Sequence, residues 1–242
     1  MRMAALATCL VAVALAAGPT PAVSQDLDRA DVQDLVLGAP ADAQPGPFRE
    51  YACGTNGGPA SVAVGGFEDF HECPAEPDTG LHEVTFRYDD EIEYYALAMN
   101  LPPVAHRFGG TRFGSFPVIV SALLDGDGIL RGYRVVTDDR GTLRERRIAY
   151  TMGVFAKAQF KGGAWDCVSL PAAAGETPLG RQFVKDDCTS VQPDGRSVSL
   201  RVRLLHKPGQ SAIDPFTGEK RLGHYESTAR LEVWDAGWGE RQ

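Results

Sequence analysis

"SVSLRVRLLH", residues 197–206, determines the fold class that this sequence predicts. Its apolar residues alternate with polar and charged ones, and successive side chains of a β-strand point to opposite faces of a sheet. The segment therefore predicts a strand with one dry face and one wet face. "HYESTARLEVW", residues 224–234, repeats the alternation, with Ala229, Leu231 and Val233 on its apolar side. A sheet that is dry on one face only is antiparallel by preference.

Six further segments have the composition of strands, because they are short, apolar or aromatic and bounded by turn signals. Asp89-Asp90 separates the first two, and the Asp-Gly-Asp-Gly sequence at 125–128 separates the next two. Each of these pairs is therefore predicted to form a hairpin. The segments are 83–88, 92–99, 117–124, 129–137, 164–170 and 181–185.

One helix is predicted, and it begins at Thr142. Thr142 and Glu145 have the capping-box spacing, in which each side chain bonds the other residue's backbone N–H. Apolar residues then recur at three- and four-residue steps as far as Phe160, and Gly162-Gly163 ends the pattern. We therefore expect an α+β fold: a curved antiparallel sheet of about six to eight strands, with one long helix packed on one face.

The composition also predicts the domain organisation. Residues 25–50 are acidic and then rich in Pro, Ala and Gly, which is typical of a flexible linker. Residues 51–236 are predicted to form a single domain, within which the glycine- and cysteine-containing segment 51–80 is a loop-rich cap. Residues 237–242 are a short C-terminal tail.

Residues 1–24 have the layout of a bacterial export signal. Arg2 precedes an apolar stretch over 4–17, Gly18-Pro19 ends that stretch, and small residues lead up to Ser24. We predict cleavage after Ser24 and a periplasmic or secreted location. The apolar stretch is too short to span a bilayer, and no later segment has the ~18 apolar residues that a membrane helix needs.

The net charge of −8 at pH 7 limits the classes of partner. An acidic chain repels phosphate backbones and anionic lipid, so binding to nucleic acid or to a membrane surface through net charge is not expected.

The cysteines predict two disulfides. Cleavage after Ser24 would remove Cys9, and an even number of cysteines in an exported chain indicates disulfide bonds. Of the three possible connectivities we favour the pairs that are close in sequence, each contributing about 3 kcal/mol to stability. These pairs are Cys53–Cys73 and Cys167–Cys188.

Several motifs resemble catalytic signatures but lack a required residue. His71-Glu72-Cys73 are adjacent, so in an extended chain their side chains point in alternate directions and cannot converge on one ion. The segment 82–86 begins like the zinc-protease motif but has Phe86 where the second histidine must stand. Gly209–Ile213 lacks the second glycine of the nucleophile elbow of hydrolases.

A secreted hydrolase nevertheless stays open as an alternative. A serine enzyme would use Ser211, Asp214 and His224, and a metal enzyme would use the scattered histidines. These are His71, His82, His106, His206 and His224.

No metal or cofactor is predicted. Asp125 and Asp127 could begin a calcium loop, but Ile129 and Val136 stand where an EF-hand needs oxygen donors, so a simple turn is favoured. The sequence has neither a Cys-x-x-Cys motif nor a phosphate-binding glycine motif.

"NLPPVAHRFGGTRFGSFP", residues 100–117, is the best candidate for a binding segment. A connection this long inside a compact domain is commonly functional, and it combines apolar anchors with cationic donors. The candidate binding residues are Arg107, Phe108, Arg112, Phe113 and Phe116. The alternative is an ordinary loop whose phenylalanines pack at the edge of the core.

A second group of arginines surrounds the start of the predicted helix. Cations at a helix N-terminus oppose its dipole, so we expect Asp138, Asp139 and Glu145 to neutralise them, with an anion-binding patch as the alternative. The arginines are Arg140, Arg144, Arg146 and Arg147.

These observations together favour a non-catalytic, exported bacterial envelope protein. It would bind a partner protein or a small anionic ligand through the 100–117 segment and the polar face of the sheet. A secreted hydrolase and a structural envelope component are the alternatives.

Overall fold

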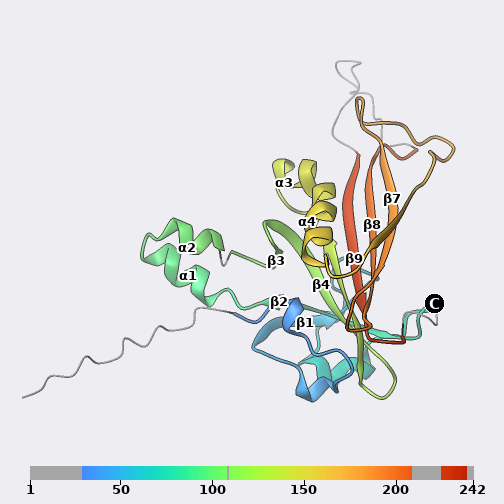
Figure 1. Ribbon diagram of the computed structural model, residues 1–242. Helices are drawn as coiled ribbons and strands as arrows, with labels where there is room; N and C mark the ends of the chain where they lie inside the picture. The colour runs from blue at the N-terminus through green and yellow to red at the C-terminus, as the bar shows by residue number, and fades with distance from the viewer. Residues whose placement is uncertain (1–28, 108, 209–224, 239–242) are drawn as a thin grey trace, which may run out of the picture.

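The computed structural model describes residues 29–107, 109–208 and 225–238, and all of their side chains except those of His106 and Arg107. Within these residues the strands form one open sheet in which every pair is antiparallel (Figure 1). Its order is β1-β2-β4-β5-β9-β8-β7-β6, and β3 also pairs with β4. The strands are β1 (Phe48–Cys53), β2 (His82–Tyr88), β3 (Arg112–Phe113), β4 (Phe116–Leu124), β5 (Leu130–Thr137), β6 (Trp165–Ser169), β7 (Val184–Val191), β8 (Ser197–Leu205) and β9 (Glu226–Trp234).

The antiparallel sheet is confirmed, but its strands differ from those predicted. The sheet has nine strands among the described residues. Two of them, β1 and the two-residue β3, were not predicted from the sequence. The segment 92–99 was predicted to be a strand and lies instead in the helix α1 (Glu91–Ala98). Asp89 accepts a hydrogen bond from the N–H of Glu91, and acidic residues occupy the first turn of α1, so the Asp-Asp pair begins a helix rather than a hairpin turn.

The predicted helix is present as a continuous helical segment, but it is not one regular α-helix. Thr142 and Glu145 form the capping box, and α3 (Leu143–Ile148), a 3₁₀ turn (Ala149–Thr151) and α4 (Met152–Gln159) follow. The N–H of Tyr150 donates to the hydroxyl of Ser227 on β9, in place of the hydrogen bond that it would make within a regular α-helix. The single long helix is therefore broken where it meets the sheet.

The core lies between α4 and the dry face of the sheet. Met152 and Ala156 are buried there against alternate residues of β8 and β9, as the alternation predicted. Gly153 permits this close approach, because a Cβ atom there would lie 2.5 Å from Cγ2 of Val202. Ile148 was expected in the core but is exposed, since it precedes the irregular turn.

Residues 29–47 pack against the body of the protein, although the sequence predicted a linker there. Val32 and Leu35 are buried in the core, and the N–H of Val32 donates to the hydroxyl of Tyr88 at 3.1 Å. The backbone of Gly38 and Ala39 bonds that of Leu130. The described part of this segment is therefore held to β2 and β5.

The polar face of the sheet carries a buried cluster of charges. Arg134 on β5 and Glu83 on β2 are each 2 % exposed. The guanidinium of Arg134 lies 2.8 Å from Glu83, 2.6 Å from Glu76 and 2.7 Å from Glu232 on β9. Burial alone would raise the pKa of Glu232, but the neighbouring guanidinium groups of Arg230 and Arg134 lower it, so this carboxylate stays ionised.

The cap contributes the remaining partners of this cluster. The N–H groups of Asn56 and Gly57 donate to the carboxylate of Glu83, and Arg230 on β9 donates to the carbonyl of Asn56. Gly57 has a positive φ of 79° and lies directly on Arg134 and Val136, where a larger residue would not fit. The cluster therefore joins three strands and the cap.

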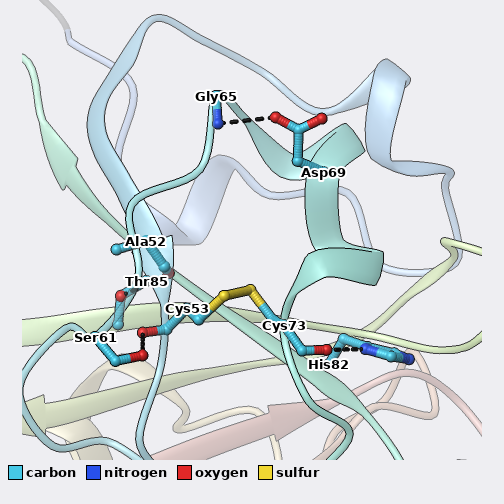
Figure 2. Close-up of a disulfide and its surroundings, with 8 residues drawn as sticks. All are labelled: Ala52, Cys53, Ser61, Gly65, Asp69, Cys73, His82 and Thr85. Atoms are coloured by element: carbon cyan, nitrogen blue, oxygen red, sulfur yellow. Dashed lines mark hydrogen bonds between the residues drawn. A yellow bond between two sulfur atoms is a disulfide. The ribbon is translucent and has the colours of Figure 1, made fainter.

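Both predicted disulfides are present. Cys53 and Cys73 join the end of β1 to the end of the 3₁₀ helix Phe67–Glu72, with a Cα–Cα distance of 5.1 Å. Cys167 and Cys188 are directly opposite each other on β6 and β7. Figure 2 shows the first bond and its surroundings: Ser61 bonds the carbonyl of Cys53, and His82 bonds that of Cys73. The predicted loop-rich cap is thus closed around the end of β2.

None of the helices in the described part of the chain has the length and apolar character required to cross a membrane.

Replacing Arg134 with Met should lower the free energy of unfolding by about 3–5 kcal/mol, because it leaves buried carboxylates without their cation. Arg196→Met is the matched control, since Arg196 pairs with Asp194 at the surface and such pairs contribute about 0–1 kcal/mol. Urea denaturation of both variants measures the difference. Equal losses in the two variants would contradict a stabilising role for the cluster.

Candidate functional site

The sheet splits between β2 and β4. Phe86 and Val120 are the last residue pair of these two strands. Beyond them lies Thr111, whose hydroxyl accepts a hydrogen bond from the N–H of Tyr88 and whose carbonyl accepts one from the N–H of Val118, both at 3.1 Å. Because Thr111 takes both N–H groups, β2 and β4 separate here and leave room for a groove.

A helical hairpin bridges this split. It consists of α1 and α2 (Pro102–Arg107), and Figure 1 shows it projecting away from the sheet. Arg29 holds its base closed, because the guanidinium donates to the carbonyl of Asp89 at 3.2 Å and to that of Gly110 at 2.7 Å. Glu93 accepts a further hydrogen bond from the N–H of Gly110 at 3.0 Å. The two ends of the hairpin are thus fixed to each other.

The groove between the hairpin and the split has a volume of about 920 Å³. Its apolar lining comes from β2 and β4, from the inner side of the hairpin and from the cap. This volume is within the range of pockets that hold ligands. The apolar contributors include Phe86, Val118, Ile119, Leu97, Ala105 and Ala60.

Each arginine that lines the groove is paired with a carboxylate. The pairs are Arg87 with Glu50 at 3.0 Å, Arg112 with Glu145 at 3.1 Å and Arg140 with Asp138 at 2.7 Å. The groove therefore contains several charges but no unneutralised guanidinium among the residues that the structure describes.

The carboxylates of Glu145 and Asp138 are stabilised in their ionised form. The backbone N–H of Thr142 and the guanidinium of Arg112 lower the pKa of Glu145. Burial alone would raise the pKa of Asp138, but hydrogen bonds from Arg140 lower it. Both groups remain charged at neutral pH, so their arginine partners stay occupied.

The structure places Arg112 in the groove wall, with each of its three side-chain nitrogens already in a hydrogen bond. Its Nε donates to the carbonyl of Gly109 and its Nη1 to that of Ser115, each at 2.8 Å, while Nη2 bonds Glu145. Arg112 therefore positions the return from the hairpin to β3. Its predicted role in binding a ligand stays a prediction.

Phe113 and Phe116 do not line the groove. Phe113 is 1 % exposed and packs edge-on against Phe155, so it offers no surface to a ligand, and Phe116 is partly buried beside the same ring. Arg107 ends α2 but its side chain is not described, and Phe108 lies outside the described residues.

The histidines in the described part of the chain are dispersed. His82 bonds the carbonyl of Cys73, His71 is exposed beside Phe70, and His206 pairs through its backbone with Thr177. The residues described contain no group of three His, Cys, Asp or Glu side chains that could hold a metal ion. The hydrolase candidates Ser211, Asp214 and His224, and the side chain of His106, lie outside the described residues.

The turn predicted at 125–128 is present. The carboxylate of Asp125 accepts hydrogen bonds from the N–H groups of Asp127 and Ile129 at 3.0 Å and lies 2.7 Å from Arg131. Both oxygens of this carboxylate are therefore used within the turn.

Two further arginine groups lie at the surface. On the polar face, Arg201 stands directly opposite Arg230, with Asp187 and Glu232 beside them, and a hollow of about 510 Å³ adjoins the pair. Near the helix start, Arg140 is neutralised by Asp138 as expected. The expectation is wrong for Arg144, Arg146 and Arg147, whose exposed side chains make no ion pair with the described residues, because Glu145 pairs with Arg112 instead.

Comparisons with protein-family models, with curated proteins and with solved structures gave no match to this chain.

Sequence reasoning missed the helical hairpin that forms one wall of the groove. A usable signal was present, because residues 94–105 contain no charge and include the strong helix formers Ala, Leu and Met. Pro102 opens α2, a position that proline favours. The periodicity alone did not distinguish this segment from a strand.

Replacing Arg112 with Ala should loosen the base of the hairpin, because three intramolecular hydrogen bonds are lost. We expect the amide of Gly110, which donates to Glu93, to exchange faster with solvent, and the free energy of unfolding to fall by about 1–3 kcal/mol. Arg181→Ala, in an exposed turn, is the control. Unchanged exchange in Arg112→Ala would contradict the positioning role.

Proposed function

We propose that this chain is a non-catalytic binding protein of the bacterial envelope, and that its groove accepts a polypeptide segment of a partner protein. The observation that carries the proposal is the lining of the groove, which combines an apolar floor with charges that are already paired. The two disulfides are compatible with an exported protein.

A polypeptide fits this lining better than a small anion does. A small anion would have to displace a carboxylate from an arginine, at the cost of a formed charge-assisted hydrogen bond. A peptide instead buries side chains on Leu97 and Ile119 without breaking any pair. At the rim, the exposed pair of Arg87 and Glu50 can exchange partners with charges of the ligand at little cost.

The experiment is affinity capture from an envelope extract, with the protein recovered from its own host as bait. Leu97→Arg and Ile119→Trp alter the groove, and Val168→Arg on the exposed edge strand β6 is the matched control. We expect each groove variant to recover at least tenfold less of the captured protein than the unaltered bait, and the control to recover as much as the unaltered bait. All three variants should keep the melting temperature of the unaltered protein. The intact mass of the bait tests whether the protein is exported. The proposal predicts the mass of residues 25–242 with no free thiol.

The small-anion alternative is measured in parallel. Phosphate and dicarboxylates should leave the melting temperature of the protein unchanged. A rise that Arg112→Ala abolishes would contradict the proposal and favour an anion site.

A further inference from the structure

One surface of the hairpin lies outside the groove and is both apolar and acidic. Tyr94 and Tyr95 are 70 % and 55 % exposed, and Met99 beside them is 70 % exposed. Glu91 shares their helical face, because residues three and four positions apart are neighbours on a helix, and its carboxylate lies 3.8 Å from the half-exposed Arg49. Asp90, the residue before the helix, is also exposed. We call these residues the hairpin face.

A second surface has the opposite charge. Leu143 and Ile148 of α3 are exposed apolar residues. Arg147 lies four residues after Leu143, and Arg144 lies four before Ile148, so the four side chains share one side of the helix. Neither arginine has an ion pair with a residue that the structure describes. We call these four residues the α3 face.

We infer that two copies of this chain associate, with the hairpin face of each copy on the α3 face of the other. The two faces match in chemistry, since each combines apolar side chains with charges of opposite sign. Exposed tyrosines on one face and arginines on the other also form favourable cation–π contacts. Tyr and Arg are among the residues most enriched at the energetic centres of interfaces.

Both halves of this complementary pair belong to the same chain, which singles out a second copy as the occupant. Figure 1 shows the hairpin standing apart from α3 within one copy. A two-fold axis forms both contacts at once and closes the assembly as a dimer. An anionic membrane is disfavoured as the occupant, because Asp90 and Glu91 adjoin the apolar residues and the chain carries a net charge of −8.

Charge reversal tests the pairing. One variant carries Asp90→Lys and Glu91→Lys, a second carries Arg144→Glu and Arg147→Glu, and a third carries all four changes. We expect sedimentation velocity to give a dimer for the unaltered protein, monomers for the first two variants and a dimer again for the third. Circular dichroism confirms that each variant is folded.

Lys161→Glu with Arg181→Glu is the control, since it alters charge by the same amount at exposed sites elsewhere and should leave the dimer intact. A monomer at every concentration up to the solubility limit overturns the inference. So does a dimer that the first two variants do not dissociate, or a quadruple variant that stays monomeric. A monomeric protein that still captures its groove partner would overturn the dimer alone and leave the proposed function standing.

Discussion

The ion cluster around Arg134 is the interaction on which the rest of the structure depends. Two of its members, Arg134 and Glu83, are almost completely buried, and such charges are tolerated only when they are paired and hydrogen-bonded. Glu83 meets this condition by accepting two backbone N–H groups from the cap as well as the guanidinium. Separating the cap from the strands would therefore break the backbone hydrogen bonds to Glu83 and the Glu76–Arg134 ion pair together.

The position of the groove follows from this constraint. The cluster fixes β2 against β5 and β9 at one end, while Thr111 holds β2 and β4 apart at the other. The strands on one side of the split are thus held in place by the ion cluster. The cap, which contributes Ala60 to the groove, is fixed by the same charges and by the Cys53–Cys73 disulfide. The hairpin extends beyond these strands and the cap, and Arg29 and Arg112 hold its base.

The sequence predicted those parts of the fold that a local pattern determines. The alternation in β8 and β9, the capping box at Thr142 and the pairing of neighbouring cysteines each depend on residues close together in the chain. The hairpin was missed because "IEYYALAM" satisfies both a strand and a helix pattern. Tertiary hydrogen bonds, such as those of Arg29 to its two ends, are not visible in its own residues.

The candidate site was predictable only in part, for the same reason. The segment 100–117 does line the groove, but Phe113 is buried in the core and Arg112 bonds the chain's own carbonyls. No local pattern around Glu83 or Arg134 shows that the cap covers the polar face on which they lie. Which groups cover a surface depends on contacts between residues distant in sequence, such as Asn56 with Arg230.

Amide hydrogen exchange at Asn56 and Gly57 tests the central claim most directly. These two amides lie in a glycine-rich loop, yet both donate to the buried carboxylate of Glu83. If the cluster fixes the cap to the sheet, their exchange should be as slow as that of the core amides of β5 and β9. Exchange as fast as that of the exposed Ala60 amide would show that the cap opens independently, and would contradict the account.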